Sequence, residues 1–278
     1  MIEFSAFADE VTTDFEEQLK FLSSEKVQFI EIRFVDGKNI MDLNEKELSR
    51  VRELLKKYRI RVSAIGSPVG KVSLEVPISE HIETFRHAFY LAKYFGTKFI
   101  RVFSYYAPEG ENIDDYGDEV ILRMKEKVKI LNGSGIMMVH ENESHIFGHS
   151  AANCVALVKG VNSSNFKLVY DPANFVWGED IANNMEVCWP QMKPFVIHIH
   201  IKDWKVGSSE VGSMPGKGDG QIPELLKELK NMNYNGFLTM EPHLKSGGQF
   251  GGDTGPELFS EAISFTRKLC DEVGLDYK

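Results

Sequence analysis

Residues 195–204, Phe-Val-Ile-His-Ile-His-Ile-Lys-Asp-Trp, alternate between two kinds of side chain. Successive side chains of a β-strand point to opposite faces, so one face would carry Val196, His198, His200 and Lys202, and the other only apolar residues. A single histidine in such a strand is typical of a hydrogen-bonded core residue. Two of them followed by Lys-Asp favour a barrel strand whose inward face leads to a functional site at its carboxyl end.

Short apolar runs of this kind recur along the chain, separated by helical stripes of apolar residues that begin at capping residues. The predicted strands cover residues 2–8, 27–34, 60–65, 98–103, 136–140, 166–170, 195–204 and 236–240, and the predicted helices begin near residues 13, 44, 79, 116, 151, 181, 222 and 256. Strict alternation of eight strands with eight helices predicts parallel strands closed into an α/β (β/α)8 TIM barrel. A doubly wound open sheet is the alternative. It usually carries Gly-x-Gly-x-x-Gly after its first strand, which Ala8-Asp9-Glu10-Val11 does not match.

Composition narrows the protein class. The 278 residues, 42% hydrophobic and 26% charged, fit one globular domain spanning 1–278, because no linker or low-complexity tract divides them. A formal net charge of -9 argues against binding to nucleic acid or to anionic membranes. The three cysteines are far apart, and neither a signal peptide nor a run of about 20 apolar residues is present, so we expect a cytoplasmic protein. The sequence leaves its oligomeric state open, a homo-oligomer included.

Four predicted strand ends carry a side chain that can bind metal. Glu141 follows strand five, Asp171 follows strand six, His200 lies near the end of strand seven, and Glu241 follows strand eight. Equivalent strand ends surround one opening of a barrel, so the four would meet there. Three neighbouring carboxylates need a positive counter-charge, which a divalent cation supplies. Oxygen-rich ligands with one imidazole favour Mn²⁺ or Mg²⁺ over Co²⁺, with Zn²⁺ also compatible, and the absence of cysteine ligands argues against structural zinc.

The motifs at these strand ends resemble the xylose isomerase-like superfamily, and within it the sugar phosphate isomerase/epimerase family, over essentially the whole chain. The resemblance is carried by His140-Glu141-Asn142, Asp171-Pro172-Ala173-Asn174-Phe175, His200-Ile201-Lys202-Asp203, Leu238-Thr239-Met240-Glu241-Pro242-His243, Gly216-Lys217-Gly218-Asp219-Gly220 and Glu31-Ile32-Arg33. It implies a metal on Glu141, Asp171, His200 and Glu241, and a small carbohydrate substrate. It also implies catalytic roles for Glu141 and Glu241, which in the ketose epimerases of this family exchange a proton with the substrate carbon.

Two positions depart from those epimerases. Asn174 stands where they carry a substrate-binding histidine, and Lys202 stands near the position of their arginine after strand seven. The resemblance therefore implies metal-dependent isomerisation or epimerisation of a sugar, sugar phosphate or related keto-polyol, rather than free-ketose 3-epimerisation in particular. Three alternatives remain. They are a metal-dependent dehydratase of an inosose-like or shikimate-like substrate, an abasic-site endonuclease, which would need more histidines at the strand ends, and a non-catalytic binding barrel.

The candidates for holding the substrate are polar residues near the same strand ends: Lys202, His145, Arg101, Glu31, Arg33, Asn174 and His198. For Glu31 and Arg33, ion pairing inside the barrel is an equal alternative, because an unpaired buried charge is costly. Asp203 could orient His200 or Lys202. The glycine-rich loops at 216–220 and 247–252 could be lids or plain connections.

Overall fold

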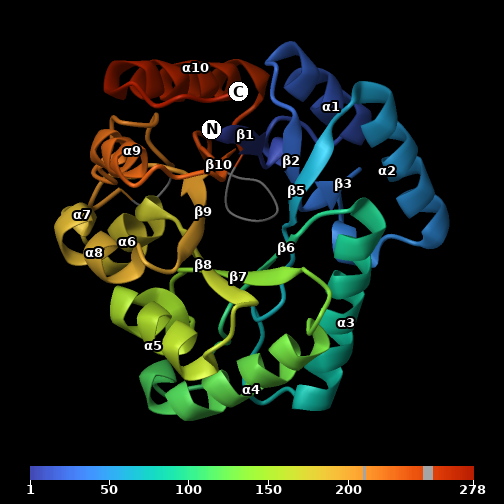
Figure 1. Cartoon of the computed structure of the whole chain (residues 1–278), viewed down its shortest axis with the longest axis vertical. Helices are drawn as coiled ribbons and strands as arrows, with labels where there is room; N and C mark the ends of the chain where they lie inside the picture. The colour runs from blue at the N-terminus through green and yellow to red at the C-terminus, as the bar shows by residue number, and fades with distance from the viewer. Residues whose placement is uncertain (209–210, 247–252) are drawn as a thin grey trace.

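The computed structural model describes residues 1–208, 211–246 and 253–278, and its core is a parallel sheet curled into a barrel (Figure 1). The sheet order is β1-β10-β9-β8-β7-β6-β5-β2, and β1 and β2 lie next to each other, so the barrel is nearly closed. Its strands are β1 Glu3–Ala6, β2 Phe29–Ile32, β5 Arg61–Ile65, β6 Phe99–Val102, β7 Met137–Glu141, β8 Phe166–Tyr170, β9 Val196–Ile201 and β10 Phe237–Met240. The predicted (β/α)8 TIM barrel is confirmed.

Helices surround the barrel, and the longer ones bury an apolar stripe against the strands (Figure 1). They are α1 Phe15–Ser24, α2 Glu45–Tyr58, α3 Ile78–Phe95, α4 Gly117–Ile130, α5 Ala151–Val161, α6 Pro172–Glu179, α7 Asn184–Val187, α8 Trp189–Met192, α9 Ile222–Asn231 and α10 Pro256–Val273, with short 3₁₀ turns η1 Ala8–Glu10, η2 Ile40–Asp42, η3 Ile113–Tyr116 and η4 Phe147–His149. Side-chain caps fix several starts. The Asn44 amide oxygen accepts from the backbone nitrogens of Lys46 and Glu47 at the start of α2. None of the helices in the described ranges is long and apolar enough to cross a membrane.

Two elements differ from the sequence-based expectation. The single helix predicted at 181–192 is wrong: two short helices, α7 and α8, occupy these residues, and a further helix, α6, precedes them. Asp171 caps α6 directly after β8, with Pro172 as its first residue, and Asp180 ends it in the left-handed conformation at a φ of 53°. A small hairpin, β3 Phe34–Val35 and β4 Lys38–Asn39, was not predicted. Its Asp36-Gly37 turn has φ of 51° and 77°, which is the combination that favours a two-residue hairpin.

Inward-facing residues of the strands form layers along the barrel axis, as the period of two requires. At the amino-terminal end lies an aromatic layer, in which the Phe29 and Phe237 ring centroids are 4.8 Å apart. Two residues further along the strands the layer becomes polar, with Glu31, Arg101 and His200, and beyond the strand ends lie Arg33 and Glu241. Apolar packing thus supports a charged layer at the carboxyl end.

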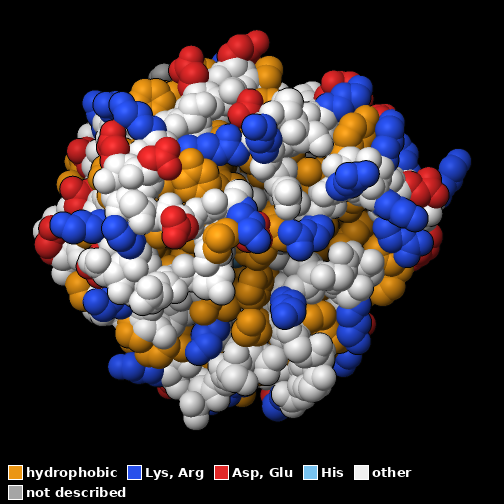
Figure 2. Space-filling view, turned by 45° about the horizontal axis from the view of Figure 1, so that its top comes forward, with side chains coloured by type: hydrophobic (Ala, Val, Ile, Leu, Met, Phe, Trp, Pro, Cys, Tyr) orange, Lys and Arg blue, Asp and Glu red, His pale blue; other side chains and the backbone are white. Residues whose placement is uncertain are grey.

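The surface is of mixed charge. The face drawn in Figure 2 carries Lys and Arg side chains around exposed hydrophobic atoms near its centre, with most Asp and Glu side chains towards the rim.

Candidate metal centre

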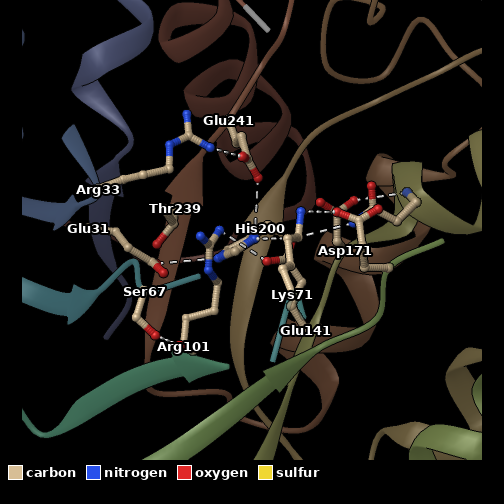
Figure 3. A network of polar contacts seen from close by, with 12 residues as sticks. Glu31, Arg33, Ser67, Lys71, Arg101, Glu141, Asp171, His200, Thr239 and Glu241 are labelled. Atoms are coloured by element: carbon tan, nitrogen blue, oxygen red, sulfur yellow. Dashed lines mark hydrogen bonds and ion pairs between the residues drawn. The ribbon is translucent and has the colours of Figure 1, made fainter. Parts of the chain in front are cut away.

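Four side chains from consecutive strands of the sheet converge at the carboxyl end of the barrel. One ligand atom each from Glu141, Asp171, His200 and Glu241 lies within 4.8 Å of the other three. Glu141 ends β7, Asp171 follows β8, His200 lies in β9 and Glu241 follows β10. None of the four is more than 3% exposed. The side chains predicted from the strand ends therefore come together in one buried group (Figure 3).

The group has the composition that a divalent cation requires. It brings three carboxylates into one buried space, and His200 Nδ1 lies 3.1 Å from Glu141 Oε1 and 3.4 Å from Glu241 Oε2. Asp171 Oδ2 and Glu241 Oε2 are buried and accept no hydrogen bond, so their close partners are charged groups, Lys202 Nζ for the first and His200 Nδ1 for the second. Buried carboxylates need compensating charge, and a bound divalent cation would supply it. The residues present fit a divalent ion with oxygen-rich ligands.

On the opposite edge of its ring, His200 contacts a further carboxylate, that of Glu31. His200 Nε2 lies 3.3 Å from Glu31 Oε2, and the same oxygen lies 2.8 Å from His198 Nε2. Thr239 Oγ1 is a further neighbour of His198 Nε2 at 3.0 Å. Burial alone would raise the pKa of Glu31, but the two histidines lower it below its ordinary value. Glu31 thus stays ionised and turns His200 Nδ1 towards the other carboxylates.

Three cations surround the cluster and pair with its members. Lys202 Nζ lies 2.9 Å from Asp171 Oδ2 and 3.8 Å from Glu241 Oε2. Arg101 Nη1 lies 3.2 Å from Glu141 Oε2, and Arg33 Nη1 lies 2.8 Å from Glu241 Oε1 (Figure 3).

These pairs decide the protonation of the carboxylates. Burial raises the pKa of Asp171 to about 6, although Lys202 opposes the shift. Burial also favours the neutral form of Glu141, but the charges of His200 and Arg101 outweigh it and lower this pKa to about 2. Glu141 is therefore the more firmly ionised of the two.

A cavity opens next to the cluster. Its lining includes Glu141, Glu241, Arg33, Arg101 and Lys202, together with residues of the β5–α3 and β7–α5 loops. Two of these loop residues form an ion pair, in which Lys71 Nζ lies 2.9 Å from Glu143 Oε2.

The seven predicted substrate-binding residues occupy four kinds of position. Arg33, Arg101 and Lys202 line the cavity. Glu31 and His198 lie behind His200 and are fully buried. Asn174 Nδ2 donates to Glu141 Oε1 at 3.3 Å and to the Asn142 carbonyl oxygen at 2.8 Å, whereas His145 is exposed, with a φ of 64°. The geometry brings the first six together around the cluster and leaves His145 apart from it; their roles remain predictions.

Asp203 has a different environment from the one expected. Its carboxylate accepts hydrogen bonds from the backbone nitrogens of Gly216, Gly218 and Gly220, at 2.8 to 2.9 Å. It fixes the glycine-rich loop and contacts neither His200 nor Lys202, which corrects the expectation that it orients one of them. A Cβ on Gly218 would meet Asp203 Oδ1 at 2.4 Å, so the close approach requires glycine there. The other candidate lid, 247–252, lies outside the described residues.

Sequence reasoning missed a group of residues on the far side of Glu241. His243 Nε2 lies 3.3 Å from Glu10 Oε1 and 3.4 Å from Glu241 Oε1, and Arg33 Nε lies 2.8 Å from Asp9 Oδ2. Asp9 and Glu10 lie in η1, which comes soon after β1, and they directly follow the strand predicted at residues 2–8. Their position after a strand is therefore the same signal that indicates Glu141 and Asp171.

The comparisons with known proteins agree with this architecture. A family model described as xylose isomerase-like TIM barrel matches residues 19–269, so the chain belongs to that family. D-psicose 3-epimerase from Agrobacterium fabrum (strain C58) is 31% identical over 118 residues, which are 42% of this chain and 37% of that protein.

Two solved structures share the fold at low identity. A D-tagatose 3-epimerase-like protein superposes with a TM-score of 0.78 at 17% identity, covering 98% of both chains. A probable 3-DHS dehydratase from Bacillus anthracis superposes with a TM-score of 0.75 at 15% identity, covering 96% of this chain and 99% of that one. The family is one of enzymes, and the proteins that this chain resembles include sugar epimerases and, by fold alone, a probable dehydratase.

Proposed function

We propose that this protein is a divalent-metal-dependent isomerase or epimerase of a sugar, sugar phosphate or related keto-polyol. The observation that carries the proposal is the convergence of Glu141, Asp171, His200 and Glu241 within 4.8 Å at the carboxyl end of the barrel. These four residues would hold the ion, with Mg²⁺ and Mn²⁺ the best matches to their donor atoms. The partial match to D-psicose 3-epimerase supports a small carbohydrate as the substrate.

A bound divalent ion supplies Lewis-acid polarisation of a substrate carbonyl, which acidifies the neighbouring carbon–hydrogen bond. The chain itself supplies the bases. Glu141 ends β7 and Glu241 follows β10, and β8 and β9 lie between these strands in the sheet, so a substrate placed between the two carboxylates meets one on each side. Arg101 holds Glu141 ionised and Arg33 pairs with Glu241 Oε1, so each carboxylate is fixed in place and able to take a proton.

The destination of the proton decides the reaction. Return from the other carboxylate to the opposite face of the same carbon inverts that centre, and return to the neighbouring carbon moves the carbonyl. Loss of a β-hydroxyl instead would make the protein a dehydratase of an inosose-like or shikimate-like compound, which is the second candidate. Asn174 and Lys202, the two departures from the ketose epimerases, lie beside Glu141 and Asp171 and so could accommodate a different substrate.

The test begins with metal analysis of the purified protein and continues in deuterated water. With Mg²⁺ or Mn²⁺ present, a panel of ketoses, keto-polyols and their phosphates is incubated with the protein and followed by NMR and mass spectrometry. Solvent deuterium at carbon supports isomerisation or epimerisation, and a loss of one water supports the dehydratase. Absence of both across the panel would overturn the proton-transfer proposal.

Substitution assigns the bases. Glu141→Gln and Glu241→Gln should each remove deuterium exchange, while Glu119→Gln, on the exposed side of α4, should leave it unchanged. A Glu141→Gln protein that still exchanges at the normal rate would exclude Glu141 as a base.

A further inference from the structure

A second cavity lies at the opposite end of the barrel from the metal cluster. Its lining includes Phe29, Arg61, Phe99 and Phe237, which are the first residues of β2, β5, β6 and β10. The last turns of α2 and α3 complete it. Its volume of about 510 Å³ lies within the usual range of small-molecule sites.

The charged residues of this cavity are all cationic. Arg52 and Lys56 come from α2, Arg61 starts β5, and Lys98 precedes β6, while the lining holds neither an aspartate nor a glutamate. Within the described part of the chain, none of these four side chains forms an ion pair with a carboxylate. All four residues are exposed, as unpaired cations elsewhere on this surface are, but these four line a single cavity that contains no carboxylate to offset their charge.

The serine and threonine hydroxyl groups in this cavity are already hydrogen-bonded within the protein, so the four cations are the main polar side chains left to contact a ligand. Thr97 Oγ1 donates to the Ser63 carbonyl oxygen at 2.6 Å, and Ser63 Oγ is engaged with Ser5 Oγ at 2.7 Å. Guanidinium and ammonium groups donate hydrogen bonds and accept none. A ligand must therefore bring the acceptors, and four unpaired positive charges favour an anion.

The remainder of the lining is aromatic. The Arg61 guanidinium carbon lies 4.1 Å from the centroid of the Phe29 ring, and that of Arg52 lies 4.7 Å from the Tyr94 ring. Each cation is thus held against a ring, which fixes part of its position before any ligand arrives.

We propose that this amino-terminal cavity is a second ligand site, which binds an organic phosphate with an aromatic body. The phosphate would contact the cationic side chains of Arg61, Lys98, Arg52 and Lys56, and the aromatic body would pack on the aromatic part of the lining, which includes Tyr94. The site is separate from the metal cluster, because the barrel's packed interior lies between the two ends. It therefore stands independently of the proposed reaction.

The test uses the full chain with EDTA present, so that phosphate groups cannot be captured through a metal at the other end of the barrel. Adenosine diphosphate is the probe, with adenosine and inorganic pyrophosphate as its two halves, and binding is measured by isothermal titration calorimetry and by the shift in melting temperature. Adenosine diphosphate should bind more tightly than either half and should raise the melting temperature.

Variants locate the binding. Arg61→Gln combined with Lys98→Gln should weaken adenosine diphosphate at least about tenfold, because two charge-assisted contacts are lost. Tyr94→Leu should weaken adenosine diphosphate but leave pyrophosphate unchanged. Lys46→Gln, exposed at the start of α2 and outside the cavity, is the matched control and should bind like the parent protein.

Several results would overturn the proposal. Adenosine binding as tightly as the diphosphate would exclude recognition of the anion, and pyrophosphate binding as tightly would exclude recognition of the aromatic body. If Lys46→Gln and the double variant lose the same affinity for adenosine diphosphate, the binding depends on the overall charge of the protein and not on this cavity. No binding of adenosine diphosphate at millimolar concentration would refute the site itself.

Discussion

Replacing Glu31 with glutamine tests whether this buried carboxylate prepares His200 for metal binding. Glu31→Gln keeps the size of the side chain and one carbonyl oxygen that can accept a hydrogen bond, but removes the negative charge. In the structure that charge lies 3.3 Å from His200 Nε2 and 2.8 Å from His198 Nε2, and all three side chains are fully buried. The variant should therefore fold, while His200 loses the partner that makes its Nδ1 a stronger ligand.

The distance sets the size of the effect. Two unit charges 3.3 Å apart interact by about 5 kcal/mol at an effective dielectric constant of about 20, which is an upper limit because a neutral imidazole carries only partial charge. Loss of such a supporting carboxylate typically weakens metal binding 10–100-fold, or about 1.4–2.7 kcal/mol. We expect a Mn²⁺ dissociation constant that rises within this range.

The assay is isothermal titration calorimetry of the metal-free protein with Mn²⁺ at pH 7.5, with the unfolding transition recorded for each variant. Ser5→Ala is the control, because Ser5 is also buried in the barrel and bonded across it to Ser63 at 2.7 Å, yet contacts none of the four ligands. It should bind Mn²⁺ like the parent protein. If Glu31→Gln binds Mn²⁺ as tightly as the parent protein, Glu31 does not act through His200 and the reasoning fails.

Three further predictions follow from buried or paired charges. The charges of Glu141 and Glu31 outweigh burial and raise the pKa of His200 above its ordinary 6.5, and burial raises the pKa of Asp171 to about 6. Metal binding must therefore release protons, so affinity should fall as the pH drops through the raised pKa of His200 and fall further below about pH 6. Calorimetry in buffers of different ionisation enthalpy should show the proton release. Lys127 is fully buried beside the Tyr105 hydroxyl, and burial lowers its pKa because a buried ammonium without a carboxylate partner is costly. Lys127→Met should therefore raise the free energy of unfolding by about 1 kcal/mol in urea unfolding. A decrease of similar size would contradict this. Burial would lower the pKa of His149, but hydrogen bonds to Asp114 and Glu179 raise it, so the stabilisation from this pairing is present below the unfolded pKa of about 6.5 and lost as pH rises through the folded value. His149→Gln should therefore lower the free energy of unfolding by about 0.5–1 kcal/mol at pH 5.5 and by less at pH 8.5. Equal losses at the two pH values would exclude the pairing.

Sequence patterns predicted the barrel because its strands are short, apolar and evenly spaced between amphipathic helices. The same patterns predict the grouping of Glu141, Asp171, His200 and Glu241, because the parallel strands of one barrel all end at the same rim. Residues at equivalent strand ends are therefore close in space although they are far apart in the chain. The region between β8 and β9 was harder to predict. There Asp171 and Pro172 start a helix at once, and this local signal conflicted with the later apolar stripe that had indicated one helix.

The pairing of charges around the cluster could not be predicted in the same way, because it depends on side-chain reach across the barrel rather than on strand order. Arg33 contacts both Asp9 and Glu241, residues 24 and 208 positions away, and no periodicity links these three. For the same reason, the sequence does not distinguish substrate binding from ion pairing for Glu31 and Arg33. The structure shows ion pairs for both, yet Arg33 also lines the cavity, so an arginine that fixes a carboxylate in the resting protein also faces the space that a substrate would enter. Glu31, which lies behind His200 and away from that space, is positioned to act only through the histidine ring.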